Sequence, residues 1–265
     1  MAASLDHICQ TLAQLAPLRL AESWDNVGLL AGDRSSQVER VMTCLTLTPD
    51  VAQEAIAKQA KLVVAHHPLP FRPLKKLTSD DLTGATLWKL SGSGVAVYSA
   101  HTAYDSAANG INQQWADFLE LTQVSSITDP DDDNPLGAGR MGTMGAPESA
   151  GRLIEQCAQF VGSPSPAVVG PIESLINKVG FACGSGGSFV AQAHRRGCQL
   201  LITGEATFHD CLLARSLGMT LGLLGHYHSE RFAMVRLAEK LHEQHPDLDC
   251  WASEVETDPI VRLNL

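Results

Sequence analysis

The chain has 265 residues, which is enough for one large domain or two small ones. Apolar residues make up 45% of the chain, so a substantial core can form without disulfides. The formal net charge of −10 argues against a nucleic-acid or anionic-membrane partner, because phosphate binding needs a positive surface. The seven cysteines form no C-x-x-C pair, which predicts reduced thiols in a cytoplasmic protein.

The first 22 residues predict an amphipathic helix, since they lack the basic start and the long apolar run of a signal peptide. No apolar run approaches the roughly 20 residues of a membrane span. A loop containing Trp24-Asp25-Asn26 is expected after this helix. We expect Trp24 to anchor the core, whereas Asp25 and Asn26 either orient the ligands of a site or form a turn.

Short apolar runs alternate with helix-period stretches through the rest of the chain. The expected strands are 41–47, 61–65, 95–100, 178–183, 199–203 and 219–224. The expected helices are 50–60, 108–121, 150–161, 188–197 and 229–243. This alternation predicts an α/β protein with mainly parallel sheets covered by helices.

A weak internal repeat predicts two similar α/β lobes. Residues 44–66 align without gaps on 183–205, and the strands that follow them end in comparable His-x-x-x-Asp and His-x-x-x-Glu motifs. Residues 129–150 are rich in Asp, Gly and Pro, which predicts a linker or exposed loop at their start and a short strand around Arg140–Met144. The expected lobes are residues 1–125, completed by 245–265, and residues 126–244, with a site in the cleft between them.

Polar side chains follow two of the strands expected in the first lobe. His66 and His67 come directly after 61–65, where adjacent imidazoles suit metal ions or, alternatively, cap backbone groups. His101 and Asp105 follow 95–100. Asp105 can offer two oxygens to a cation, and His101 can ligate or hydrogen-bond a ligand, but a structural loop is the alternative.

Comparable groups follow two strands of the second lobe. His226 and Glu230 lie one helical turn apart, a spacing that can chelate or bridge metals, although Ser229 or His228 could instead cap the helix. Glu205 and His209 follow 199–203, and His209 is the candidate general acid or base by side-chain type. Glu205 and the earlier His101 are further candidates for acid–base catalysis or for supporting the ligands.

Histidine and carboxylate ligands without cysteine favour Zn, Mn, Fe, Co or Ni over a structural thiolate zinc site. Two such ions can clamp a substrate and lower the pKa of a bridging water, which supplies a hydrolytic nucleophile. Gly184–Ser188 opens a predicted helix and either cradles a phosphate or makes a tight turn. Arg72, Lys75 and Lys76 follow the first histidines and could help to bind phosphate groups.

These residues stand in motifs that resemble the type-two GTP cyclohydrolase I family, also called Nif-three-like. The similarity covers nearly the whole chain through ESWDNVGLLAGD, VAHHPLPFRPLK, YSAHTAYDSAANGIN, CGSGGSF, LITGEATFHD and GHYHSE. It implies two similar α/β lobes, a dinuclear centre of divalent ions between them and a homohexamer. The ligands that it implies are His66, His67, Asp105, His226 and Glu230.

By position in these motifs, His67 and Asp105 would serve one ion, His66 and His226 the other, and Glu230 both. The implied reaction is opening of the guanine imidazole ring of GTP by metal-bound hydroxide. We therefore expect a metal-dependent hydrolase of a nucleotide or related heterocycle. The alternatives are a non-enzymatic metal-binding, metal-delivery or scaffold protein and a phosphate-binding module without metals.

Overall fold

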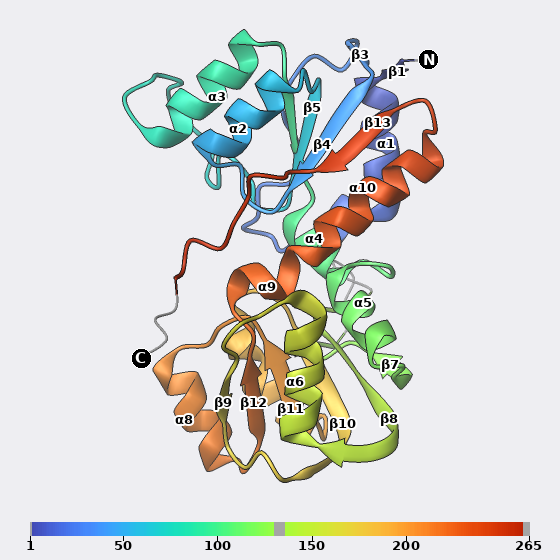
Figure 1. Ribbon diagram of the computed structural model, residues 1–265, viewed down its shortest axis with the longest axis vertical. Helices are drawn as coiled ribbons and strands as arrows, with labels where there is room; N and C mark the ends of the chain where they lie inside the picture. The colour runs from blue at the N-terminus through green and yellow to red at the C-terminus, as the bar shows by residue number, and fades with distance from the viewer. Residues whose placement is uncertain (1, 130–135, 262–265) are drawn as a thin grey trace. The chain divides into compact units, whose positions relative to one another are not determined.

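The computed structural model describes residues 2–129 and 136–261, which form two compact α/β units (Figure 1). The first unit comprises the chain up to Ala107 together with Ala233–Thr257, and the second comprises Ala108–Phe232 with the chain from Asp258 onward. The expected lobes had different boundaries, at 125/126 and 244/245. The two units are similar lobes in which the central parallel strands follow the same order.

The first unit is built on a five-stranded sheet with the order β13-β4-β5-β6-β2. Neighbouring strands are parallel except for β2, which pairs antiparallel with β6 and places Gly28 opposite Ser99. The strands are β2 (Gly28–Ala31), β4 (Arg40–Cys44), β5 (Leu62–Ala65), β6 (Ala96–Ser99) and β13 (Asp249–Ala252), with a short ribbon of β1 (Ala3–Ser4) and β3 (Gln37–Val38).

Helices cover both faces of this sheet, with α2 and α3 on one face and α1 and α10 on the other (Figure 1). Every residue of β5 and β6 is buried, which explains why these strands are apolar except for Ser99 at the end of β6. The helices are α1 (Leu5–Leu15), η1 (Leu18–Leu20), α2 (Pro49–Ala57), α3 (Leu82–Gly92), α4 (His101–Ser106) and α10 (Phe232–Gln244).

Side-chain caps fix where three of these helices begin. Ser4, Thr48 and Asp81 each accept a hydrogen bond from the backbone N–H three residues later, at the start of α1, α2 and α3 respectively. Such a bond satisfies one of the N–H groups that have no partner within the helix, which stabilises it by about 1 kcal/mol.

The second unit contains a six-stranded sheet with the order β7-β8-β10-β11-β12-β9. Its three central strands are parallel, and the outer strands β8, β9 and β7 are joined to it in antiparallel pairs. The strands are β7 (Thr122–Ser125), β8 (Arg140–Ser149), β9 (Ala167–Val169), β10 (Leu175–Ala182), β11 (Leu200–Thr203) and β12 (Thr220–Leu223).

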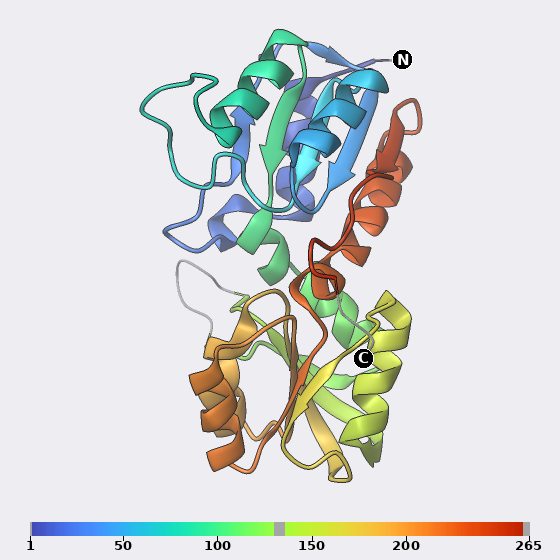
Figure 2. The ribbon, with the colours of Figure 1, turned by 60° about the vertical axis from the view of Figure 1, so that its left-hand side comes forward.

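Two layers of helices cover this second sheet, with α8 on one face and α6 on the other (Figure 2). Trp115 is the largest buried side chain on the α6 side, where it stacks on Phe181 at 5.5 Å and meets Phe160 at 5.7 Å. The helices are α5 (Ile111–Phe118), α6 (Ala150–Val161), η2 (Gly186–Phe189), α7 (Val190–Arg195), α8 (Phe208–Ser216) and α9 (His226–Glu230).

All six expected strands are present as β4, β5, β6, β10, β11 and β12. The strand expected near Arg140 is longer than predicted and continues to Ser149. The linker expected at the start of 129–150 lies largely outside the described residues. No helix of the described chain is both long enough and apolar enough to cross a membrane.

Candidate metal centre

His66 and His67 continue the line of β5 beyond its last residue. The His66 N–H donates to the Cys44 carbonyl at 2.9 Å and the His67 N–H to the Leu45 carbonyl at 2.8 Å, so both histidines are tied to the backbone at the end of β4. The side chain of His66 is fully buried. These backbone bonds hold both imidazoles at the carboxyl end of the sheet, as the sequence predicted.

The hydroxyl of Thr46 fixes one nitrogen of His67. Its Oγ1 lies 2.8 Å from His67 Nδ1, and Thr46 itself follows β4 directly. Nδ1 of His67 is therefore engaged by a protein group, an arrangement that in histidine–metal sites directs Nε2 toward the ion. Thr46 had no part in the sequence prediction, although its place at the exit of a neighbouring strand was the signal that could have identified it.

His101 stands at the start of α4 with a positive φ of 21°, which is unusual for a residue with a side chain. Its Nδ1 lies 2.8 Å from Oδ1 of Asp25, whose side chain is fully buried. Oδ2 of Asp25 accepts from the backbone N–H and from the hydroxyl of Thr102. Asp25 therefore orients a site residue, which was one of the two roles predicted for it.

The environment of Asp25 favours its ionised form. Burial by itself would raise the pKa of the carboxyl group, but the hydrogen bonds from His101 and Thr102 outweigh this effect and hold the pKa below its ordinary value. A carboxylate can only accept this bond, so Nδ1 of His101 carries the shared proton, an arrangement that directs Nε2 toward the ion in many histidine–metal sites.

His66, His67 and His101 each present a ring nitrogen to a common point, and these nitrogens lie within 4.8 Å of one another. We call these three residues the histidine cluster. Asp105 follows one turn after His101 on α4, and its Oδ1 lies 3.5 Å from Nε2 of His66. Three imidazoles and a carboxylate form a donor set that fits a divalent transition-metal ion.

His226 and Glu230 form an equivalent group in the second unit. They begin and end α9, at the carboxyl end of β12, and His226 Nε2 lies 3.1 Å from Glu230 Oε2. Glu205, at the exit of β11, accepts a hydrogen bond from His226 Nδ1 at 2.9 Å and another from the Ser185 hydroxyl at 2.6 Å. We call His226, Glu230 and Glu205 the histidine–glutamate group.

Contacts within this group favour the charged forms of His226 and Glu205. The hydrogen bond with Glu230, supported by Glu205, raises the pKa of His226 to about 9 despite the opposing effect of burial. Bonds from Ser185 and His226 lower the pKa of Glu205. A divalent ion bound at Nε2 would replace the proton there, so this group offers a cation site with two carboxylates beside it.

The glycines of the 184–187 loop are explained by close packing. Gly184 has a φ of 61°, and a Cβ atom at this position would overlap Oε1 of Glu230. At Gly186 a Cβ would come within 2.6 Å of Thr203 Oγ1, which already accepts a hydrogen bond from the Gly186 N–H. The loop therefore brings backbone against the buried Glu230 carboxylate, which favours the tight-turn interpretation over the phosphate cradle.

Ser229 and His228 do not cap α9. The Ser229 hydroxyl accepts from the Gly184 N–H and donates to the His226 carbonyl, both at 2.9 Å. His228 points elsewhere, with Nδ1 3.3 Å from the Val161 carbonyl oxygen and Nε2 3.3 Å from an Asp258 carboxylate oxygen. Both residues thus support α9, while His226 and Glu230 carry its candidate ligand atoms.

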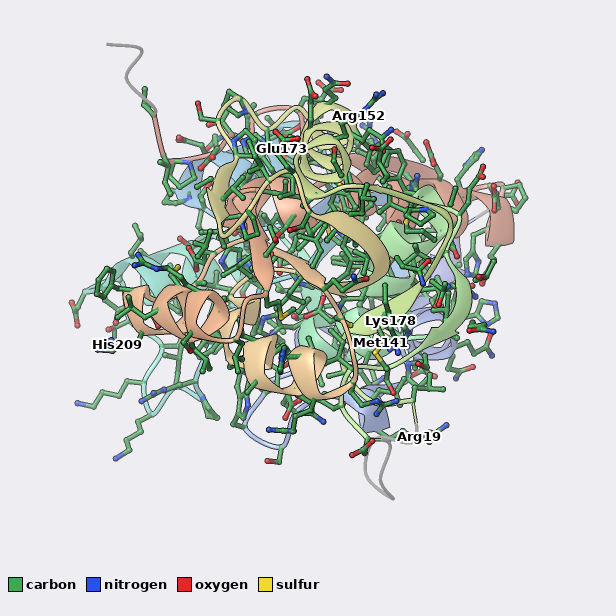
Figure 3. The ribbon with its side chains drawn as sticks, turned by 90° about the horizontal axis from the view of Figure 1, so that it is seen from below. Arg19, Met141, Arg152, Glu173, Lys178 and His209 are labelled. Atoms are coloured by element: carbon green, nitrogen blue, oxygen red, sulfur yellow. The ribbon has the colours of Figure 1, made fainter. Side chains whose placement is uncertain are left out.

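The remaining residues singled out in the sequence occupy exposed positions. His209 lies in the first turn of α8, where Figure 3 labels it, with its ring beside the exposed Phe208. Trp24 is 58% exposed, so the prediction that it anchors the core was wrong. The neighbouring Asp25 is the residue that turns inward, and Trp24 is left on the surface.

Comparison with known proteins extends over almost the entire chain. A relative from Clostridium perfringens, named GTP cyclohydrolase 1 type 2 homolog, is 29% identical over 96% of this chain and 98% of its own. A GTP cyclohydrolase 1 type 2 from Helicobacter pylori is 33% identical over 91% of this chain and 92% of its own. The structure of a Bacillus cereus protein related to NIF3 shares the fold, with a TM-score of 0.90, 20% identity and 99% coverage of both chains.

The sequence model of one family matches residues 3–259, which include both units and every candidate ligand. This match, together with the similarity to the Helicobacter relative over nine-tenths of the chain, decides the family. The chain belongs to the Duf34/NIF3 (NGG1p interacting factor 3) family.

Proposed function

We propose that this protein is a metal-dependent hydrolase with a dinuclear centre, acting on a nucleotide or a related nitrogen heterocycle. The observation that carries the proposal is the presence of histidine and carboxylate ligand atoms at the carboxyl ends of neighbouring strands in each unit. The relatives named GTP cyclohydrolase 1 type 2 support a nucleotide as the substrate class.

The proposed ligands are His66, His67, Asp105, His226 and Glu230. The assignment of ligands from both units to shared ions rests on the sequence resemblance. When bound, two divalent ions would polarise the substrate and lower the pKa of a water molecule. The donor atoms suit Zn, Mn, Fe, Co or Ni.

Neighbouring side chains would hold the ligands in place and handle protons. Thr46 and Asp25 each engage Nδ1 of a histidine, which directs Nε2 of His67 and His101 toward the metal site. Glu205 engages Nδ1 of His226, and its side chain is half-exposed, so it could pass a proton between His226 and solvent. His209, which is exposed on α8, is a less well-supported candidate for this role.

Metal analysis of the purified chain, followed by assays of metal-loaded protein, tests this function. We expect about two divalent ions per chain and release of formate or another hydrolysis product from GTP or from a panel of cyclic amides and phosphoesters. His67→Ala and Glu230→Ala should lose both metal and turnover. His194→Ala, which changes an exposed histidine of α7, is the matched control.

The outcomes separate the enzyme from its alternative. Activity that survives unchanged in both ligand variants would overturn the hydrolase. Two bound ions without turnover on any substrate of the panel would instead support a non-enzymatic metal-binding or metal-delivery protein. A preparation that takes up no metal after reconstitution would contradict both functions.

We also propose a cytoplasmic homohexamer. This assembly is implied by the sequence resemblance, and the seven cysteines are all free thiols, as expected in a reducing compartment. Light scattering coupled to size-exclusion chromatography would measure the assembly directly. A monomer at micromolar concentration would refute the hexamer without affecting the metal site.

A further inference from the structure

Two large aromatic side chains lie exposed beside the histidine cluster. Trp24 is 58% exposed and Phe71 is 50% exposed, although their ring centroids are only 5.8 Å apart. Each ring also meets His101 edge to face, at 6.0 Å for Trp24 and 6.1 Å for Phe71. The pair therefore leaves about half of its surface open to solvent beside a residue of the candidate metal centre.

The backbone segments that carry these rings are tied together. Asp25, next to Trp24, is held by His101 and Thr102, and Asn26 donates from its Nδ2 to the Pro70 carbonyl at 2.8 Å. Pro70 directly precedes Phe71. A ligand that stacks on this pair would have little side-chain and loop entropy to remove, because both rings are attached to segments already fixed by hydrogen bonds.

Three cations follow the aromatic pair along the chain. Arg72, Lys75 and Lys76 are all exposed, and none of them forms an ion pair with any described residue. No acidic residue occurs from His66 to Ser79, although the whole chain carries a net charge of −10. Lys76 is five residues beyond Phe71, so an extended chain places it at most about 18 Å away.

From this arrangement we infer that Trp24 and Phe71 stack on the planar ring of a nucleoside phosphate and that Arg72, Lys75 and Lys76 bind its phosphate groups. Stacking on an aromatic side chain tolerates any base, because every base has a π-face. The cations provide the complementary charge that an otherwise acidic protein needs to attract a phosphate. This inference rests on the proposed function in that it places the ring of the substrate beside the histidine cluster.

Equilibrium binding of GTP, guanosine and inorganic triphosphate to the metal-loaded full-length protein separates the two halves of the inference. Trp24→Ala and Phe71→Ala should each weaken binding of GTP and of guanosine by about 5- to 150-fold and leave binding of triphosphate nearly unchanged. Trp24→Phe should restore most of the lost affinity. The matched control is Trp88→Ala, since Trp88 is 62% exposed on α3 of the same unit.

The double variant Lys75→Ala/Lys76→Ala tests the phosphate half. It should weaken the binding of GTP and of triphosphate and reduce the dependence of GTP affinity on salt. The binding of guanosine should not change. Lys61→Ala, which removes an exposed charge elsewhere in the first unit, is its control. Metal content should equal that of the wild type in every variant, because none of these residues offers a ligand to the proposed ions.

The results distinguish this inference from the proposed function. GTP that binds through Trp24, with no turnover of GTP or of any other substrate of the panel, would refute the hydrolase and retain the nucleotide site. Hydrolysis of GTP with guanosine affinity unchanged within twofold in Trp24→Ala would overturn the nucleotide site and retain the hydrolase. A Trp24→Ala variant that changes only the oligomeric state would also overturn it, because the rings would then serve contacts between copies of the chain.

Discussion

Replacing Asp25 by Asn tests whether a buried carboxylate sets the metal affinity of the histidine cluster. The two oxygens of Asp25 accept from His101 Nδ1 and the Asn26 N–H, both at 2.8 Å, and from the N–H and hydroxyl of Thr102. Asn has one oxygen fewer, so its amide NH₂ must replace either Oδ1 or Oδ2 and face the donors that bond to that oxygen in the wild type. In either orientation one backbone N–H loses its acceptor.

The magnitude follows from this loss. A buried N–H without an acceptor costs about 1–3 kcal/mol, so the first unit should unfold at a lower urea concentration than in the wild type. His101 would either accept from the amide through Nδ1, which moves its proton to Nε2, or bond to a neutral oxygen. Both changes loosen the hold on the His101 ring, which lies against the proposed ligands His66 and His67, and metal affinity should fall by about 10- to 100-fold.

Calorimetric titration of metal-stripped protein with Zn²⁺ or Mn²⁺, alongside urea unfolding, measures both effects. Asp80→Asn is the control, because Asp80 is an exposed carboxylate of the same unit that accepts a hydrogen bond from the nearby Thr78 hydroxyl. If Asp25→Asn binds metal within twofold of the wild type, Asp25 does not tune His101. An unchanged urea midpoint would also contradict the loss of an acceptor by one backbone N–H in this variant.

Three other substitutions test residues that stabilise the fold or hold a candidate ligand in place. Gly184→Ala should displace the Glu230 carboxylate and cost about 1–2 kcal/mol for its left-handed backbone, with a matching loss of metal measured by metal analysis. Trp115→Phe should destabilise the second unit by about 1–3 kcal/mol in urea, since the indole N–H that donates to the Ser229 carbonyl at 2.9 Å is lost. Glu54 is buried, and although burial would raise its pKa, hydrogen bonds hold that pKa below its ordinary value. Its contribution to stability is therefore present at neutral pH and disappears as pH falls through the lowered pKa, so Glu54→Gln should flatten the fall in urea midpoint between about pH 5 and 3. If the urea midpoint of Glu54→Gln falls as steeply with decreasing pH as that of the wild type, ionised Glu54 does not contribute this stability.

The central strands could be predicted because a strand buried on both faces is apolar along most of its length. Two of the longer helices, α3 and α8, were missed for a physical reason. Helix α3 has apolar side chains around much of its circumference and a glycine at each end, so it shows little helical periodicity. Helix α8 has a weak apolar stripe, but its capping box of Thr207 and Asp210 was a sequence signal that could have located its start.

The sequence indicated that Asp25 could orient a ligand of the site, but not which histidine it contacts, because that depends on which strands become neighbours. Asp25 reaches His101 across 76 residues of sequence. It does so because β2 pairs antiparallel with β6 and sets Gly28 opposite Ser99, which brings the loop before β2 to the residues after β6. The same pairing explains the error at Trp24. Asp25, the neighbour of Trp24, turns inward to bond His101, so the Trp24 indole remains on the surface. An exposed aromatic ring beside the candidate metal centre can contact a ligand, which a ring buried in the core cannot do.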